Sequence, residues 1–254
     1  MRIERVGIIG AGTMGAGLTQ KLLMEGFTTH LVDTSAENLE RGQRRLRESF
    51  QEAQQRRLLS EAQVSASMQR LHTSTEIQTV APCQLVIEAV YENLEVKRRL
   101  FTELSERCPE TTILASNTSS FKIAELSSAC RCPERLLGLH FFFHPAKNRL
   151  VEVVGHDGTD PERLQSAWAF QEAIGKVPIR AADAPGFIVN RFFVPWLNEA
   201  ARLSEEGFSL PDIEQTAKET FGIGLGPFEL MNVTGVPVTL HAATTLAQHL
   251  DSFY

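Results

Sequence analysis

The sequence predicts an α/β fold in which a doubly wound, mostly parallel sheet precedes a smaller, all-helical domain. Over about the first 180 residues, short β-rich runs alternate with helical patterns, which is the order of elements in such sheets. From Phe187 onward only helical patterns remain. The segment Asp183-Ala-Pro-Gly186 separates the two regions, so we expect a sheet domain over residues 1–183 and a helical domain over 184–254.

Short apolar runs bounded by turn residues are the expected strands. They cover residues 6–9, 28–32, 85–88, 112–115, 136–142, 150–154 and 177–179. Helices between the earlier runs predict parallel strands with both faces of the sheet covered. The last runs follow one another without long helical patterns between them, so we expect the sheet to end antiparallel.

Two amphipathic helices are expected in the first region. The clearest covers about residues 36–59, with Leu39, Leu46, Phe50 and Ala53 on one face. Thr34 and Glu37 have the spacing of a capping box at its start. A second helix is expected over about 93–107.

The helical domain is divided by glycines. Helical patterns cover about residues 187–205, 211–221 and 236–249. Ser209 is a typical residue before a helix, and Gly222 is a typical residue after one.

Composition excludes several classes of protein. The 254 residues are 43% hydrophobic with a net charge of −6, which is ordinary for a globular protein and excludes a disordered or collagen-like chain. Lys and Arg number 25 against 31 Asp and Glu, so we expect no nucleic-acid partner. No apolar run reaches membrane-spanning length. The first strand begins too early for a signal or transit peptide, although a processed organellar protein would look the same.

The cysteines are few. Cys83, Cys108, Cys130 and Cys132 suggest no disulfide framework in a chain of this length. Cys130 and Cys132 form a C-x-C pair, but no second Cys/His pair of matching spacing follows, so we expect no metal site. These features favour a reducing, cytoplasmic location.

A glycine-rich run follows the first strand. Gly10-Ala-Gly12-Thr13-Met14-Gly15 lies between an apolar strand and a helical pattern. Gly10 suits the tight turn, Gly12 lets the backbone approach a pyrophosphate, and Gly15 lets the helix pack closely on the sheet. The amino end of the helix offers free N–H groups to the phosphates. The run, including Thr13 and Met14, therefore predicts a dinucleotide site on a Rossmann-like sheet.

Asp33 at the end of the second strand indicates which dinucleotide binds. Its carboxylate is placed to accept hydrogen bonds from the adenosine ribose and to repel a 2′-phosphate. No Arg follows immediately, so NAD is favoured over NADP. The alternative is that Asp33 only precedes the cap of the next helix.

Further segments follow in a characteristic order and spacing. Together they resemble the L-3-hydroxyacyl-CoA dehydrogenase family over about residues 4–240. The segments are Ile87-Glu-Ala-Val-Tyr-Glu-Asn-Leu94 with Lys97, Ser116-Asn-Thr-Ser-Ser120, Gly138-Leu-His-Phe-Phe142, Leu150-Val-Glu-Val153, Pro185-Gly-Phe-Ile-Val-Asn-Arg191 and Gly226-Pro-Phe-Glu-Leu230.

The resemblance implies an NAD-dependent oxidoreductase of fatty acid β-oxidation that converts a 3-hydroxyacyl-CoA to a 3-ketoacyl-CoA. His140 matches the catalytic histidine of the family, and Glu152 matches its acidic partner. Ser119 and Asn190 match residues that hydrogen-bond the substrate oxygen or support the histidine.

Cofactor-side residues are implied in the same way. Glu92 and Lys97 match positions that line the nicotinamide side of the cleft, and Asn117 lies in the adjoining cofactor-binding segment. Members of the family generally dimerise through the helical domain, so a homodimer is expected if that domain is complete.

The residues themselves agree with a catalytic pair. His140 ends one apolar strand and Glu152 lies in the next, so a hairpin would bring them side by side. A neutral imidazole can take the hydroxyl proton while hydride leaves C3 for the nicotinamide. A carboxylate on the other ring nitrogen would fix the tautomer and stabilise the imidazolium.

The chain departs from the family pattern at several points. Phe143 stands where members usually carry Asn, which favours an apolar group near the reacting carbon. Arg56 and Arg57 stand where the family uses Lys against CoA phosphates, with simple surface solvation as the alternative. The family's helical domain usually continues beyond the last motif, whereas this sequence ends at Tyr254, so we expect it to be truncated.

Two other functions remain open from the sequence. One is dehydrogenation of a free 3-hydroxy acid or sugar acid, with Lys147 or Arg149 binding the carboxylate. The other is a non-catalytic, crystallin-like NAD-binding protein, which is disfavoured by the joint presence of His140, Glu152, Ser119 and Asn190.

Overall fold

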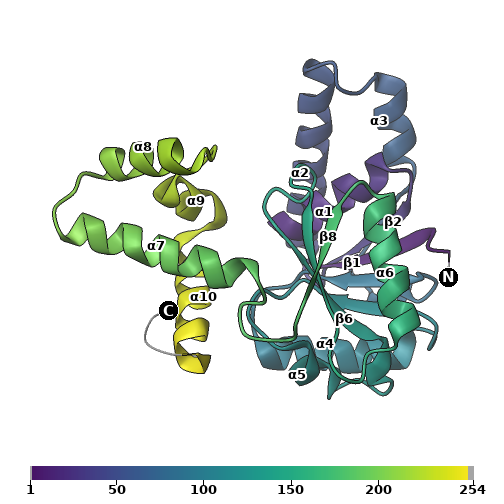
Figure 1. The fold of residues 1–254 in the computed structure, drawn as a ribbon. Coiled ribbons are helices and arrows are strands. Elements are labelled where there is room, and N and C mark those ends of the chain that lie inside the picture. The colour runs from purple at the N-terminus through teal and green to yellow at the C-terminus, as the bar shows by residue number, and fades with distance from the viewer. Residues whose placement is uncertain (1, 251–254) are drawn as a thin grey trace. The chain divides into compact units, whose positions relative to one another are not determined.

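The computed structural model describes residues 2–250, which form two compact units (Figure 1). The sheet unit contains the chain up to Thr118 and Lys122–Asp183. The helical unit contains Ser119–Phe121 and the chain from Ala184 onward. The short segment 119–121 therefore belongs to the second unit although it follows a strand of the first.

The sheet unit is built on one eight-stranded sheet in the order β3-β2-β1-β4-β5-β6-β7-β8. All neighbouring pairs are parallel except β6 and β7, which are antiparallel. The carboxyl ends of β1, β4, β5 and β6 therefore meet at one edge, where open α/β sheets bind ligands. The strands are β1 (Arg5–Ile9), β2 (Thr28–Val32), β3 (Leu71–Ser74), β4 (Leu85–Glu88), β5 (Ile113–Ser116), β6 (Leu136–Phe141), β7 (Leu150–Val154) and β8 (Val177–Ala181).

Helices cover both faces of this sheet. Residues of α1, α2 and α6 share one hydrophobic cluster with the strands, while α4 and α5 lie side by side along the other face (Figure 1). The doubly wound sheet predicted from the sequence is confirmed. The helices are α1 (Thr13–Met24), α2 (Ala36–Gln55), α3 (Glu61–Met68), α4 (Leu94–Arg107), α5 (Ile123–Ser127) and α6 (Pro161–Ala173), with 3₁₀ turns η1 (Ile77–Val80) and η2 (Pro133–Arg135).

Helix α2 begins one residue later than a cap at Thr34 would place it. Ser35 has extended backbone angles and its Oγ accepts a hydrogen bond from Asn38 N at 3.2 Å. The predicted capping box is therefore wrong, because the neighbouring hydroxyl reaches the free N–H group. The predicted buried face is confirmed for Leu39, Leu46 and Phe50, whereas Ala53 near the end of the helix is only half-buried.

The expectation of no long helix among the last strands is wrong. Helix α6 lies between β7 and β8, with Asp160 as its N-cap and Pro161 in its first turn. It is a crossover, so β7 and β8 pair in parallel, while the short connection from β6 to β7 gives the expected antiparallel pair. Strand β3 was also missed, because Leu-His-Thr-Ser is a polar edge strand without an apolar alternation.

The helical unit consists of α7 (Val189–Glu205), α8 (Leu210–Phe221), α9 (Pro227–Thr234) and α10 (Val236–His249). Ser209 caps α8 and Gly222 ends it with a left-handed φ of 62°, as predicted. Helix α9 was not predicted; it is eight residues long and has a glycine at each end. Within residues 2–250, no helix combines the length and apolar character that crossing a membrane requires.

Candidate active site

The glycine-rich turn after β1 has the form that a dinucleotide requires. Gly10 has a φ of +104°, and a Cβ there would lie 2.5 Å from Ala89 O. A Cβ on Gly15 would lie 1.8 Å from Gly10 O, whereas a Cβ on Gly12 would meet nothing within 4 Å. The backbone at Gly12 thus borders open space at the amino end of α1.

The start of α1 fits a pyrophosphate electrostatically. Its first turn, which includes Thr13 and Met14, has no acidic residue, and no side chain caps its N–H groups. Free N–H groups and the positive end of the helix dipole favour an anion at this position. The residues present therefore fit the phosphates of a dinucleotide.

Asp33 connects the glycine-rich turn to the start of α2. Its Oδ2 accepts a hydrogen bond from Ala11 N at 2.9 Å, and its Oδ1 accepts from Ser35 N at 3.0 Å. The carboxylate therefore links the backbone of the glycine-rich turn to the backbone just before α2, where the adenosine end of the predicted site lies. The ribose contact of Asp33 stays a prediction.

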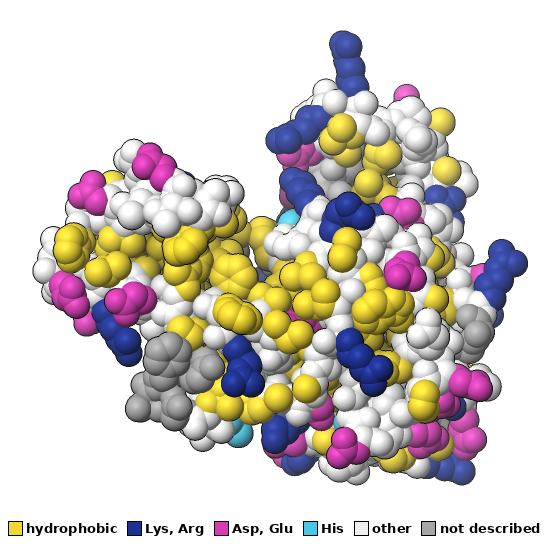
Figure 2. Space-filling view, viewed as in Figure 1, with side chains coloured by type: hydrophobic (Ala, Val, Ile, Leu, Met, Phe, Trp, Pro, Cys, Tyr) yellow, Lys and Arg dark blue, Asp and Glu magenta, His cyan; other side chains and the backbone are white. Residues whose placement is uncertain are grey.

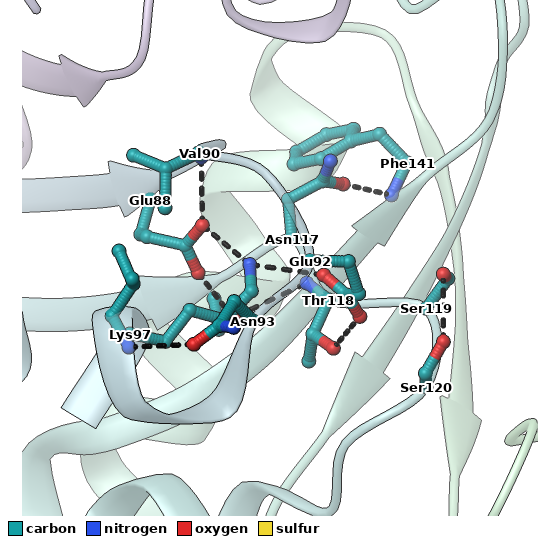
Figure 3. Close-up of polar contacts among 12 residues, drawn as sticks. Glu88, Val90, Glu92, Asn93, Lys97, Asn117, Thr118, Ser119, Ser120 and Phe141 are labelled. Atoms are coloured by element: carbon teal, nitrogen blue, oxygen red, sulfur yellow. Dashed lines mark hydrogen bonds and ion pairs between the residues drawn. The ribbon is translucent and has the colours of Figure 1, made fainter. Parts of the chain in front are cut away.

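A buried polar network lies where β4 and β5 end (Figure 3). Glu88 is fully buried, and it accepts hydrogen bonds from Ser116 Oγ and Lys97 Nζ, both at 2.6 Å. Lys97 also pairs with Glu92 at 3.1 Å, and Glu92 accepts a short hydrogen bond from Thr118 Oγ1. The ends of β4 and β5 and the start of α4 are thus tied together by charged groups.

Lys97 stays charged in this network. Its side chain is 1% exposed, and burial alone would lower its pKa. The negative charges of Glu88 and Glu92 outweigh burial and raise the pKa above its usual value. The ammonium is therefore a permanent partner for both carboxylates.

Asn117 follows β5 and contacts the strand that carries His140. Its Oδ1 accepts a hydrogen bond from Phe141 N at 2.8 Å, and its own N–H donates to Glu88 O at 2.9 Å (Figure 3). The contact with Phe141 joins residues 24 positions apart in the chain. Sequence reasoning missed it, because only the end of β5 relative to β6 reveals it.

His140 and Glu152 are brought together by the antiparallel pairing of β6 and β7. They are direct partners in the register, and His140 Nδ1 lies 2.5 Å from Glu152 Oε2. His140 is 6% exposed and Glu152 is fully buried. An Nδ1–H that donates to the carboxylate leaves Nε2 as the basic nitrogen, which is the arrangement of a general base.

Ser119 and Asn190 lie in the helical unit. Asn190 is in the first turn of α7, and its Nδ2 donates to Ser119 O at 3.2 Å. Ser119 Oγ lies 3.3 Å from Ser120 Oγ. The structure thus joins these two predicted substrate residues to each other.

The predicted CoA-binding residues lie at the end of α2. Arg56 is exposed and pairs with Glu52 at 2.6 Å, and Arg57 is exposed with a φ of 56°. Phe143 follows β6 and is 38% exposed. It lines a pocket of about 290 Å³, together with His144 and residues of α1 and α2, among them Thr13, Gly17, Arg45 and Ser49.

The four cysteines are free thiols, and three of them are buried. Burial raises the pKa of Cys83 and of Cys130 to about 12, so these thiols stay protonated. Among residues 2–250, no three His, Cys, Asp or Glu side chains are grouped as metal ligands would be.

Comparison with known families identifies both parts of the chain. Residues 5–184 match the family described as "3-hydroxyacyl-CoA dehydrogenase, NAD binding domain". Residues 186–252 match "3-hydroxyacyl-CoA dehydrogenase, C-terminal domain".

Individual relatives agree with that result. Hydroxyacyl-coenzyme A dehydrogenase, mitochondrial, of Sus scrofa is 38% identical over 244 residues, which cover 93% of this chain and 78% of that protein. The probable 3-hydroxybutyryl-CoA dehydrogenase of Bacillus subtilis is 32% identical and covers 100% of this chain and 89% of that protein. The crystal structure of M. tuberculosis FadB2 is similar with a TM-score of 0.97 at 30% identity, covering 100% of this chain and 90% of that chain.

Proposed function

Because the chain belongs to the 3-hydroxyacyl-CoA dehydrogenase family, a family of NAD-dependent oxidoreductases, we propose that it interconverts 3-hydroxyacyl-CoA and 3-ketoacyl-CoA esters. The observation that carries this proposal is the buried pair of His140 and Glu152, with 2.5 Å between Nδ1 and Oε2. The pair supplies a base whose orientation and tautomer are fixed before substrate binds.

His140 moves the proton in the proposed reaction. Its Nε2 removes the proton of the substrate's 3-hydroxyl group as C3 becomes a carbonyl carbon. NAD, when bound, supplies the acceptor for the hydride that leaves C3. Glu152 stabilises the imidazolium that results, and in the reverse direction this imidazolium returns the proton to the oxygen on C3.

Residues around the pair are proposed to bind substrate and cofactor. Ser119 and Asn190 hydrogen-bond the oxygen on C3, and Glu92 faces the nicotinamide end of NAD. Lys97 holds Glu92 in place, since its ammonium is buried between two carboxylates. Asp33 binds the adenosine ribose.

The pocket beside α2 supports a CoA ester as substrate. Phe143 and His144 line it together with residues of α1 and α2, and Arg56 and Arg57 lie at the end of α2. We propose that the apolar part of the ester lies against Phe143 and that Arg56 and Arg57 attract its phosphates.

A free 3-hydroxy acid or sugar acid is the second candidate substrate, but the structure offers it little support. Lys147 and Arg149 are both exposed, and Arg149 Nε donates to Gly175 O at 3.2 Å. A non-catalytic role is disfavoured because the His140–Glu152 pair keeps the geometry of a working base.

The direct test compares substrates and cofactors in one assay. Oxidation of NADH is followed with acetoacetyl-CoA, with acetoacetate, and with NADPH in place of NADH. We expect turnover with acetoacetyl-CoA and NADH and a much lower kcat/KM in the other two cases. Equal efficiency with the free acid would favour the second candidate, and equal use of NADPH would refute the role of Asp33.

We further propose that the helical unit pairs with a second copy of the chain. Exposed aromatic side chains border an apolar pocket of about 420 Å³ there, and Figure 2 shows hydrophobic side chains gathered over this unit. The lining residues are Phe192, Phe193, Trp196, Phe221 and Ile223. Light scattering of the purified protein should give twice the monomer mass, and Phe192→Asp should give the monomer mass.

The proposed cellular location rests on the free state of the cysteines. The four free cysteines favour a reducing compartment, and we propose the cytoplasm. Fractionation of cells that express the full-length protein tests this, and recovery in an organelle would contradict it.

A further inference from the structure

Strand β6 extends beyond the end of its neighbour β5. The two strands pair from Leu114 with Leu136 to Ser116 with Gly138. Strand β6 continues to Phe141, so its last residues have no β5 residue beside them on that side. The side chain of Asn117, the first residue after β5, reaches this gap and accepts the N–H of Phe141 at 2.8 Å.

We infer that Asn117 is a positioning residue for His140. Its amide oxygen takes the place of a strand carbonyl and holds the backbone of the residue that follows His140. The inference rests on the proposed function, since it concerns the base of that reaction. A displacement of about 1 Å at such a base lowers turnover by as much as about 100-fold, so a fixed backbone at this point matters for catalysis.

Asn117 is itself held from both neighbours. Ser116 Oγ donates to Glu88 Oε2 at 2.6 Å, and Thr118 Oγ1 donates to Glu92. The backbone N–H of Asn117 donates to Glu88 O at 2.9 Å. The backbone that carries the Asn117 side chain is therefore anchored to β4 and to the Lys97 network, which places the amide oxygen opposite the N–H of Phe141.

Phe141 is held from its other end as well. Its ring lies beneath Lys176, whose Nζ is 5.6 Å from the ring centroid. The backbone is thus fixed by Asn117 and the ring is fixed by a buried cation. On its other edge β6 is paired with β7 through His140 and Glu152. Removing the amide oxygen would leave the Phe141 N–H without the partner that aligns the end of β6.

The chemistry of the amide separates this role from direct cofactor binding. Positioning uses the oxygen of Asn117 as an acceptor, whereas a contact with a carbonyl or phosphate of NAD would use its NH₂ group as a donor. Asn117→Asp keeps an oxygen acceptor and removes the donor. Asn117→Leu keeps the same branching at Cγ and removes both.

The experiment measures kcat with acetoacetyl-CoA, NADH affinity by fluorescence, and amide hydrogen exchange of the peptide that contains Phe141. Thr112→Val is the matched control, because Thr112 Oγ1 donates to Cys83 O at 2.9 Å at the opposite end of the same β5 region. We expect Asn117→Leu to lower kcat about 10- to 100-fold and Asn117→Asp to retain at least a third of it. NADH affinity should stay within twofold in both, and exchange at Phe141 should rise only in the Leu variant.

Three results would overturn the inference. One is near wild-type kcat and unchanged exchange in Asn117→Leu. Another is an equal loss in the Leu and Asp variants with weaker NADH binding, which assigns Asn117 to the cofactor. The third is an equal loss of kcat in Thr112→Val. No turnover by the wild-type protein would instead refute the proposed function, while the exchange data would still decide whether Asn117 holds Phe141.

Discussion

Two buried lysines in the sheet unit carry their charge in opposite surroundings. Lys97 in α4 is 1% exposed and lies between Glu88 and Glu92, which raise its pKa against the effect of burial. Lys176, just before β8, is 5% exposed and donates to two backbone carbonyls, of Pro145 and of Asn148. Burial, assisted by the charge of Lys21, lowers the pKa of Lys176 to about 8.

The difference shows that partners, and not burial, decide whether a buried ammonium is stable. The attraction of two carboxylates offsets the free energy that desolvation of the ammonium group costs, whereas backbone carbonyl dipoles offset only part of it. Each lysine also fixes a different part of the candidate site. Lys97 holds Glu92 and the end of β4, and Lys176 holds the turn that follows Phe143.

The largest effect on stability is expected from removing the positive charge of Lys97. Lys97→Met leaves Glu88 buried without its counter-charge, so we expect the free energy of unfolding to fall by about 3–5 kcal/mol. Urea titration measures this loss. Adding Glu88→Gln to the variant should recover part of it, because the uncompensated charge is then gone. A loss below about 1 kcal/mol would mean that the ion pair does not govern this region.

The contribution of Lys176 to folding stability is expected to depend on pH. An unfolded lysine titrates near 10.5 and Lys176 titrates near 8, so between these values the unfolded chain binds more protons than the folded chain. The folded state therefore gains stability as pH rises. Relative to Lys176→Met, we expect the wild-type protein to gain about 1–3 kcal/mol between pH 7 and pH 10. A constant difference between the two proteins would refute the lowered pKa.

A smaller effect on stability is expected where a buried amide group has neither a carboxylate nor a backbone carbonyl as partner. Gln171 in α6 is fully buried, and within residues 2–250 neither of its side-chain polar atoms has a hydrogen-bond partner. Gln171→Met should raise the free energy of unfolding by about 1–2 kcal/mol, since it removes an unsatisfied amide at similar volume. Gln165→Met, at an exposed position of the same helix, is the control and should change little. A destabilised Gln171→Met variant would contradict this account.

The smallest effect on stability is expected from the exposed arginines. The side chains of Arg56 and Glu52 are 65% and 49% exposed, and such pairs contribute less than about 1 kcal/mol. Replacing Arg56 and Arg57 by Ala should leave unfolding nearly unchanged and raise KM for acetoacetyl-CoA about two- to tenfold at constant kcat. The same substrate without its 3′-phosphate should show less of this effect. An unchanged KM would assign both residues to surface solvation.

Much of the sheet unit could be predicted because its signals are local. Buried runs such as residues 85–88 and 150–154 mark strands directly, and the glycine spacing after β1 reports a backbone requirement. Helix α6 and strand β3 were missed because a weakly amphipathic helix and a polar edge strand lack a clear period. Their places are decided by packing against the rest of the sheet.

In the candidate site, too, only some of the contacts could be predicted from the sequence. His140 and Glu152 could be paired in advance because a short antiparallel connection brings neighbours in sequence together. The contact of Asn117 with Phe141 depends on how far β6 extends beyond the end of β5, and the anchoring of the turn by Lys176 depends on where the loop between β6 and β7 lies relative to the start of β8. Such contacts have no sequence period, so only the folded chain reveals them.

Turnover of acetoacetyl-CoA by His140→Gln tests the central claim most directly. Glutamine keeps a polar side chain but cannot exchange the proton, so we expect kcat to fall by about 10²–10⁴-fold with NADH affinity within twofold of wild type. His72→Gln, at an exposed position of β3, is the matched control and should keep wild-type kcat. A kcat for His140→Gln within threefold of wild type would contradict the assignment of His140 as the base.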